Sequence, residues 1–398
     1  MICILHHKTY SYVPSVHPFL FNELSKRQAD DFHVIDIGTK TLKQIREQIA
    51  HVSLLVIDQS VLNALHITSG KMRKKITYMY LPNLKEVEFY STLLHHIINL
   101  SVPVLHWFSI TDAHGVLTVD LKKITHANIQ VETYLQRISG IIWGYRSEKL
   151  TDIKKVPSHY AETWFDESEN PVESYKTIAR HIKYDIEIIH CLNKTEFFTA
   201  KKKWDIDVPG VTYKTRKIVQ EILKEHTFSS PKKNSQLLIG KLNGLIKKSR
   251  LLSPTFIFKN NYLAMRYYIS RCRSCFVCGS SLRYFVRKFL EVPAFESVML
   301  AYPPVNMSDY GFIDNIHYVH TEPEEIAEKL EWLLNDEEIQ LRIIHAAKQL
   351  VHQQHTDSVR ASQLVKALRF VSKDEITTAH FNNGRYTYYN REKEILTD

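Results

Sequence analysis

The stretch LRYFVRKFLEVPAFESVMLAYP, residues 282–303, places a charged run directly before a compact apolar one. The spacing predicts a helix over about 281–291, with side chains separated by one helical turn. The charged residues of this helix are Arg283, Arg287, Lys288 and Glu291. The apolar runs SCFVCG (274–279) and VMLA (298–301) on either side are typical of buried strands. Strand, helix and strand in this order predict a βαβ unit of a parallel sheet.

The same alternation extends in both directions along the chain. In the first half, apolar runs predict strands at 2–5, 32–37, 53–58, 102–108 and 138–145, with helices at 17–27 and 87–100. In the second half we expect helices at 193–204, 212–226, 321–336 and 337–354, with strands at 205–210, 253–258 and 314–321. Thr321 and Glu324 have the spacing of a capping box at the start of one of these helices.

This pattern predicts an α/β fold with two Rossmann-like parallel-sheet domains facing a cleft. In this interpretation residues 1–165 form the N-terminal Rossmann-like domain and residues 166–374 form the C-terminal one. A polar stretch around 150–175 marks the change between them. Residues 375–398 form a polar, tyrosine-rich tail that can pack back on the N-terminal domain.

Composition narrows the class of protein. Of 398 residues, 44% are hydrophobic, and the formal net charge is +9, which suits an anionic partner without selecting one. There is neither a signal-peptide pattern nor an apolar run long enough to span a bilayer, so we expect a cytoplasmic protein whose membrane contact is at most peripheral. The 11 glycines form neither a classical dinucleotide motif nor a P-loop.

The charged run at 283–291 has two interpretations on residue pattern alone. Arg287 and Glu291 have the i, i+4 spacing of an ordinary ion pair on a helix surface. Alternatively, a glutamate can accept the two hydroxyls of a ribose while arginine and lysine hold phosphates.

The segment from about 276 to 365 resembles the C-terminal half of group 1 glycosyltransferases with the GT-B fold, in particular the spore-maturation-protein-type branch. The resemblance is carried, in order and spacing, by RKFLEVPAFESVMLAYP, YGFIDNIHYVH, EPEEIAEKLEWLLNDEEIQLRI and AAKQLVHQQHT. It implies that Glu291 binds the ribose of a nucleotide-sugar donor, with Arg287 and Lys288 beside the diphosphate. It also implies that the loop 311–315, which includes Asn315, lines the donor pocket. By the same resemblance, the C-terminal domain binds the nucleotide sugar and the N-terminal domain presents the acceptor.

Two positions depart from the family pattern. Many group 1 enzymes carry a further glutamate eight positions before the ribose-binding one, and this chain has Arg283 there. The small residue that usually follows the alanine is absent, because the chain continues Ala294-Phe295. With these departures we still expect nucleotide binding. The family pattern no longer predicts which sugar is transferred, with which stereochemistry, or whether the protein is catalytically active.

A second phosphate candidate is VPGVTYKTRK, residues 208–217. A predicted strand ends at Gly210 and a helix follows, so free backbone N–H groups at the helix start favour phosphate. Lys214 and Arg216 add positive charge there and would contact the donor diphosphate, whereas the alternative is a capped surface helix with solvated side chains.

Metal chemistry is the weaker interpretation of two other motifs. The pair Asp205 and Asp207 matches an Asp-x-Asp pattern, but alternation along a strand explains it equally well. The run Cys272, Cys275 and Cys278 falls in an apolar strand, where buried thiols are expected. We therefore predict no metal and no cofactor beyond the donor itself.

On the acceptor side, polar residues follow or interrupt the predicted strands of the first half. His106 lies in the fourth strand and Asp112 in the loop after it, so either can serve as the base that an inverting transferase needs. His6 and His7 at the end of the first strand are further candidates. The alternative for each of these residues is a purely structural role or a position on the surface without a function.

Together these features predict a metal-independent, hexosyltransferase-like glycosyltransferase of polysaccharide biosynthesis that moves a sugar to a glycan, lipid-linked or polymer acceptor. One alternative is a transferase acting on DNA or a teichoic-type polymer, with nucleic acid the less favoured acceptor. Another is a non-catalytic binding or assembly protein on the same scaffold. The basic runs 201–203 and 247–250 can touch an anionic lipid surface or an anionic polymer, and the favoured alternative is that they are solvated faces.

Overall fold

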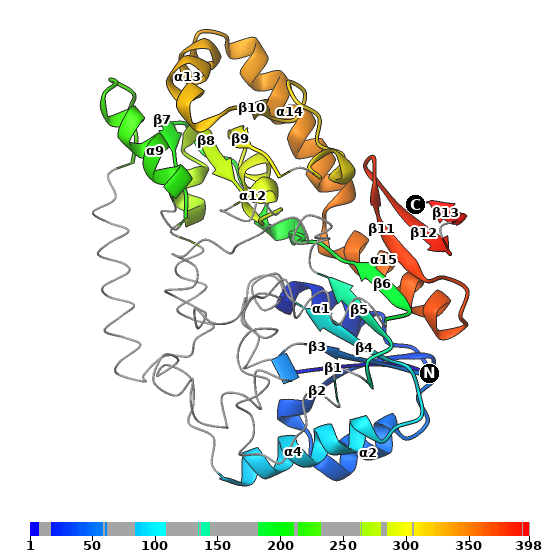
Figure 1. Ribbon diagram of the computed structural model, residues 1–398. Coiled ribbons are helices and arrows are strands. Elements are labelled where there is room, and N and C mark those ends of the chain that lie inside the picture. Colours follow the sequence, from blue (N-terminus) through cyan, green and yellow to red (C-terminus); the bar gives the residue numbers. More distant parts are fainter. Residues whose placement is uncertain are drawn as a thin grey trace. The chain divides into compact units, whose positions relative to one another are not determined.

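The chain divides into two compact units, each described here by itself (Figure 1). Unit 1 comprises Met1–Ile189, Ala361–His380 and Tyr386–Asp398, and unit 2 comprises His190–Arg360 and Phe381–Arg385. The computed structural model describes residues 1–7, 17–58, 60–61, 84–108, 134, 137–143, 182–210, 214–231, 263, 265–279, 285–304, 306–391 and 393–397.

Unit 1 is built on a nine-stranded sheet, as counted over the described residues, with the order β13-β12-β11-β6-β5-β4-β3-β1-β2. Its strands are β1 (Ile2–His6), β2 (Phe32–Asp36), β3 (Leu54–Asp58), β4 (Val104–Phe108), β5 (Gly140–Trp143), β6 (Tyr184–Glu187), β11 (Thr378–Asn382), β12 (Arg385–Asn390) and β13 (Lys393–Thr397). The ladders joining β2, β1, β3, β4, β5, β6 and β11 are parallel, whereas β12 and β13 pair antiparallel. The buried apolar runs of the sequence thus form the centre of this sheet.

The helices of unit 1 bury apolar side chains against this sheet. They are α1 (His17–Lys26), α2 (Leu42–Ile49), α4 (Leu84–Ile98) and most of α15 (Asp357–Ser372). Helix α2 begins with a capping box between Thr41 and Gln44, and it buries Ile45 and Ile49. Helices α2 and α4 lie side by side (Figure 1).

Unit 2 contains a four-stranded parallel sheet in the order β10-β9-β8-β7. Its strands are β7 (Trp204–Asp207), β8 (Cys272–Cys278), β9 (Val298–Tyr302) and β10 (Val319–His320). Its helices include α9 (Lys214–Lys224), α12 (Lys288–Ala294), α13 (Ile326–Leu334) and α14 (Glu337–Gln354), with short 3-10 turns η5 (Lys194–Glu196), η6 (Ser308–Tyr310) and η7 (Pro323–Glu325). The predicted α/β fold with two parallel sheets is confirmed.

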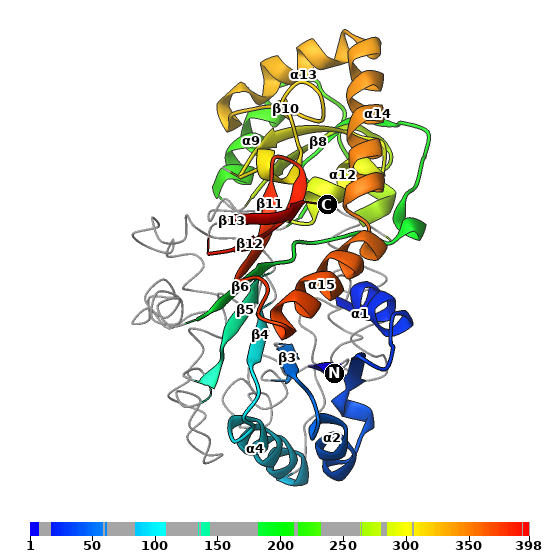
Figure 2. The same cartoon turned by 90° about the vertical axis from the view of Figure 1, so that its right-hand side faces the viewer.

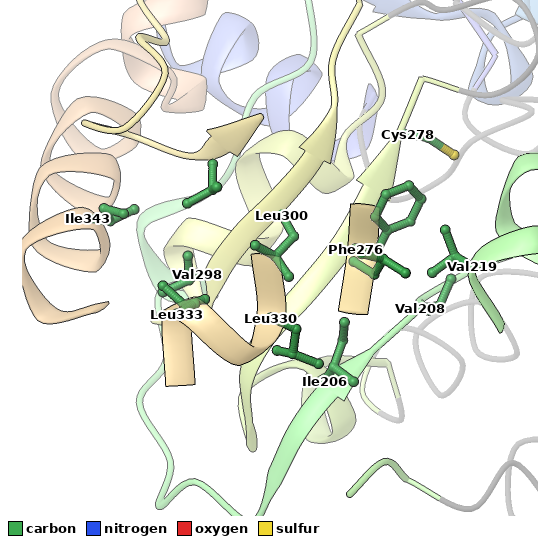
Figure 3. Packing of buried hydrophobic residues seen from close by; sticks show 12 residues of the cluster. Ile206, Val208, Val219, Phe276, Cys278, Val298, Leu300, Leu330, Leu333 and Ile343 are labelled. Carbon is green, nitrogen blue, oxygen red and sulfur yellow. The ribbon is translucent and has the colours of Figure 1, made fainter. Parts of the chain in front are cut away.

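One face of the second sheet carries the apolar core of unit 2 (Figure 3). Phe276 and Leu300 from neighbouring strands, together with Leu330 and Leu333 from α13, are fully buried there. Val219 of α9 and Ile343 of α14 complete the contact from two further helices. Helices α13 and α14 pack against each other beside β9 (Figure 2).

Three predicted elements differ from the structure. The helix expected at 193–204 is limited to η5, because the backbone N–H groups of Lys203 and Trp204 both bond to the carbonyl of Arg271 and extend the chain. The strand expected at 314–321 is only the two-residue β10. The capping box predicted at Thr321 does not form, because the Thr321 hydroxyl donates to the carbonyl of Val319.

The predicted domain boundaries also need correction. Strand β6 pairs with β5, so the first sheet continues beyond the boundary placed at 165/166. Residues 361–374 pack in unit 1, although they were predicted to belong to the second domain. The chain after residue 375 supplies β11, which pairs with β6, and then β12 and β13.

No helix in the described part of the chain is long and apolar enough to cross a membrane.

The core of unit 2 can be tested by replacing Leu300 with alanine. Leu300 is fully buried in β9, so Leu300→Ala should lower the free energy of unfolding by about 2–5 kcal/mol. The change is measured by urea denaturation followed by circular dichroism. Leu341→Ala, at a leucine that is 59% exposed, is the matched control and should change stability by less than about 0.5 kcal/mol. Equal losses in the two variants would contradict this packing.

Candidate donor site

Helix α12 carries the charged residues singled out in the sequence, but its limits differ from the prediction. It begins at Lys288, with Arg287 as its N-cap, so Glu291 lies in the first turn and not at the end of a helix over 281–291. The physical reason is tertiary packing just before the helix, where Phe285 is fully buried and stacks near Tyr310 and Phe289. Arg283 lies outside the described residues.

Three of the predicted donor residues come together in one buried cluster. Arg287 Nη1 donates to Glu291 Oε1 at 2.6 Å, and Lys288 Nζ donates to Glu291 Oε2 at 2.9 Å. Glu291 is only 2% exposed, and Arg287 is also buried. Both oxygens of the Glu291 carboxylate therefore have a cationic partner.

The fourth member of the cluster, Glu196, was not predicted. Arg287 Nη2 donates to Glu196 Oε1 at 2.5 Å, and the Glu196 side chain is 3% exposed. Glu196 is held in place as the last residue of a capping box, in which its other oxygen accepts the N–H of Asn193 at 2.6 Å. The Asn-x-x-Glu spacing at 193–196 is a readable capping signal, but nothing in it indicates a partner 91 positions away.

The cluster is electrically balanced, with two carboxylates facing one guanidinium and one ammonium group. Burial alone would raise the pKa of Glu291, but the charges of Lys288 and Arg287 outweigh it and hold that pKa below its ordinary value of 4.5. Glu291 is therefore ionised at neutral pH. Lys288 is the most exposed of the four, with 17% of its side chain accessible.

The second predicted phosphate site lies where β7 leads into α9. Gly210 has a φ of +102°, and a Cβ placed on it would lie 2.7 Å from Nη1 of Arg216. The arginine side chain, which is only 4% exposed, thus lies against the glycine. Lys214 is the first residue of α9. The structure brings Gly210 and Arg216 together but places Arg216 in a buried position, not on a solvated helix face.

The loop that was predicted to line the donor pocket follows η6. Gly311 has a φ of +84° and Asn315 a φ of +59°. The carboxylate of Asp314 accepts the N–H groups of Asn315 and His320 at 2.9 and 2.7 Å, which fixes a tight turn. The side chain of Asn315 is exposed.

On the acceptor side, the structure does not favour His106 as a base. His106 lies within β4 with no exposed surface, its Nδ1 is 2.7 Å from the hydroxyl of Tyr134, and burial lowers its pKa to about 3. The imidazole packs and hydrogen-bonds within the sheet in this structure, and its assignment as the base for the sugar acceptor stays a prediction. Asp112 lies outside the described residues.

His7 lies at the carboxyl end of β1, where residues from β2 and β3 also converge. Its backbone N–H donates to Ser60 Oγ at 2.8 Å, and Ser60 in turn bonds to Asp58. Burial lowers the pKa of His7 to about 4, although Asp36 opposes this shift. The neighbouring His6 stacks on Phe21, with ring centroids 4.2 Å apart. These histidines are held by structural contacts.

The remaining motifs also have structural partners. Asp205 accepts the N–H and hydroxyl of Ser229 at 2.9 and 2.7 Å, and Asp207 accepts the N–H of Val208 at 2.8 Å. Cys272, Cys275 and Cys278 are free and fully buried, which confirms the interpretation as buried thiols.

Helix α12 lies in a segment that matches a known protein-family model. Residues 261–366 match the family model described as "Glycosyl transferase-like". The match includes Arg287, Lys288 and Glu291, and it confirms the resemblance of this segment to glycosyltransferases. The spore-maturation-protein-type branch is not distinguished by it and stays a prediction. No curated protein matches the chain in sequence.

Several solved structures are similar to nearly the whole chain. An α-glucosyltransferase in complex with UDP and a 13-mer DNA has 12% identity and a TM-score of 0.48, covering 94% of this chain and 99% of that one. HepE from Anabaena, in complex with UDP and glucose, has 11% identity and a TM-score of 0.43, covering 92% and 99%. Sucrose-phosphate synthase from Thermosynechococcus elongatus has 9% identity and a TM-score of 0.47, covering 94% and 99%. At these values the similarities carry no conclusion about function.

Neutralising Glu291 should strongly destabilise the protein. Glu291→Gln leaves Arg287 and Lys288 with one carboxylate between them in a buried position, so we expect a loss of about 3 kcal/mol in the free energy of unfolding at pH 7. Because the native pKa of Glu291 is lowered, its contribution is present above pH 4.5 and is lost as the pH falls through the native pKa. Urea denaturation at several pH values should therefore show the difference between wild type and variant shrinking in acid. The exposed Glu225→Gln is the control; a similar loss there would contradict the assignment.

Buried histidines should make the fold sensitive to mild acid. His106 and His7 have native pKa values of about 3 and 4, and burial places that of His355 well below 6.5. Since the unfolded chain binds their protons first, stability should fall as the pH drops below 6.5, by up to about 1.4 kcal/mol per pH unit for each histidine. His106→Gln should reduce this slope, and His51→Gln, at an exposed histidine, should not. A flat profile between pH 6.5 and 4.5 would contradict the prediction.

Proposed function

We propose that this protein transfers a sugar from a nucleotide-diphosphate sugar to an acceptor. The observation that carries the proposal is the position of the buried Arg287–Lys288–Glu291 cluster within the glycosyl transferase-like residues 261–366. Carboxylate and cationic groups side by side are the chemistry that a ribose and a diphosphate require. Such an enzyme works by positioning the donor and by stabilising the charge of the leaving diphosphate.

Lys288 is the residue of the cluster that a bound donor would contact first. Both oxygens of Glu291 are engaged in the unliganded arrangement, one by Arg287 and one by Lys288. A diphosphate that draws the partly exposed Lys288 towards itself frees one carboxylate oxygen for a ribose hydroxyl. Arg287 stays fixed between Glu196 and Glu291 and keeps the carboxylate ionised and oriented.

Further positive charge for the diphosphate comes from the segment after β7. Arg216 and Lys214 at the start of α9 follow a strand parallel to β8, and the carboxyl ends of parallel strands face the same edge of a sheet. With these cations the reaction needs no metal ion. Asn315 and the loop 311–315 stay predicted contacts of the donor.

For the acceptor we propose a chemical class and not a single compound. A glycan, a lipid-linked sugar or a polymer fits the +9 charge of the chain when it carries phosphate, and DNA or a teichoic-type polymer is the alternative acceptor. We propose a hexose as the transferred sugar and a cytoplasmic location with peripheral membrane contact. Asp112 stays the predicted acceptor base, because His106 is buried.

A second candidate function is nucleotide binding or assembly without turnover. The balanced cluster favours it, because the two cations already satisfy Glu291 and can serve a purely structural purpose. Arg283, at the position where related enzymes carry a sugar-binding glutamate, points in the same direction.

A thermal-shift series tests the donor site directly. Wild type is heated with UDP, GDP, CDP or ADP, and one of them at 100 times its dissociation constant should stabilise the fold by about 2.7 kcal/mol. Lys288→Met should lose this stabilisation, while Lys224→Met, at an exposed lysine of α9, should retain it. Removal of divalent cations with EDTA should leave the shift unchanged.

The outcomes separate the two candidates. A nucleotide response accompanied by sugar release from the matching nucleotide sugar supports the transferase. A response without sugar release or transfer supports the binding protein. If none of the four nucleotides stabilises the wild type, the donor site is wrong.

A further inference from the structure

A basic and aromatic surface lies at the amino-terminal edge of the second sheet. Strands β7 and β8 are parallel and paired from Trp204 and Cys272 onward, so the residues around these two positions share one edge. We define the basic–aromatic surface as Lys201, Lys203, Trp204, Leu263, Arg266, Tyr267, Arg271 and Arg273.

Hydrogen bonds and ring contacts join several residues of this surface. The backbone N–H groups of Lys203 and Trp204 donate to the carbonyl of Arg271 at 2.7 and 3.1 Å. The Arg271 guanidinium lies 3.8 Å from the ring centroid of Tyr267 and donates to its carbonyl at 3.2 Å. Arg266 lies over the ring of Phe198 at 4.3 Å, and Lys203 lies over Trp204 at 5.1 Å.

The surface includes large apolar side chains that are accessible. Leu263 is 44% exposed and Tyr267 is 46% exposed, and their i, i+4 spacing puts both on one side of the helical residues there. Lys201, Lys203 and Arg273 are also exposed, on the two segments that pair at this edge. The nearest carboxylate in sequence, Asp205, is half-buried and accepts a hydrogen bond from the hydroxyl of Ser229, so its single negative charge is outnumbered by the exposed cations.

The geometry points to a bilayer containing anionic lipids as the partner of this surface. Exposed leucine and tyrosine side chains enter the boundary between headgroups and acyl chains, while lysine and arginine bind the lipid phosphates. Nucleic acid fits less well, because one face of the Tyr267 ring and one of the Trp204 ring carry their own cations, which hinders base stacking. An exposed leucine offers nothing to a phosphate backbone.

This inference names the surface for the peripheral membrane contact of the proposed function and rests on that part of it, but not on the donor site. The eight residues are distinct from Glu196, Arg287, Lys288 and Glu291, so donor binding and membrane binding can fail separately. If both hold, the surface keeps the transferase at the membrane where lipid-linked acceptors are found.

Vesicle sedimentation of the full chain tests the surface. The protein should sediment with vesicles of phosphatidylcholine and phosphatidylglycerol at least about tenfold more strongly than with phosphatidylcholine alone, and added salt should weaken the binding. Lys201→Glu combined with Lys203→Glu should reduce binding by about tenfold or more. Lys40→Glu combined with Lys217→Glu, an equal change of charge at exposed lysines elsewhere, should have a much smaller effect.

A second pair of changes separates docking from attraction by charge alone. Leu263→Ser combined with Tyr267→Ser leaves the net charge unaltered and should still reduce binding several-fold. Circular dichroism spectra and urea unfolding transitions like those of the wild type would show that these variants are folded, whether or not a nucleotide binds.

Three results would overturn the inference. One is equal sedimentation with neutral and anionic vesicles. Another is unaltered binding after the Lys201 and Lys203 reversals. The third is the absence of vesicle binding together with binding to single-stranded DNA, measured by fluorescence anisotropy, that the same reversals abolish; nucleic acid would then be the partner.

Discussion

The guanidinium of Arg287, held between two buried carboxylates, is the interaction on which the candidate site depends. Glu196 and Glu291 are 3% and 2% exposed, and each would be costly to ionise without this cation. The pairing joins the start of unit 2 to α12, a helix of seven residues that contains Pro293. A helix this short has little stability of its own, so the charges and the surrounding apolar contacts hold it.

The position of Arg287 in turn depends on an aromatic cluster that fixes the chain before α12. Phe285 is fully buried and packs near Tyr310, Phe312 and His355. His355 Nε2 donates to the carbonyl of Tyr310 at 2.9 Å, and Arg360 donates to its Nδ1 at 2.6 Å, which fixes the neutral imidazole. The lowered pKa of His355 keeps this cluster uncharged, so no additional cation is introduced into the interior near Arg360.

Sequence reasoning predicted most of the sheet strands because long apolar runs leave few alternatives to burial. It missed β6 and the C-terminal strands, whose composition is polar. A signal was nevertheless present in FNNGRYTYYN, since Asn383-Gly384 is a typical hairpin turn and Tyr386 and Tyr388 alternate towards the core. Both turn residues have positive φ, and a Cβ on Gly384 would lie 3.1 Å from the Cα of Gly311. That contact links segments 73 positions apart, which no local pattern can indicate.

In the candidate site, too, local contacts could be predicted from sequence spacing and long-range contacts could not. The i, i+4 spacing of Arg287 and Glu291 predicted their pairing, because it follows from helical geometry. Glu196 could not be predicted, since its contact depends on the tertiary fold. The cluster is neutral as a whole, so a diphosphate must find additional positive charge nearby. We propose that the buried Arg216, placed after the neighbouring parallel strand, supplies part of this charge. A donor would thus be recognised by two segments far apart in sequence, each following one of two paired strands.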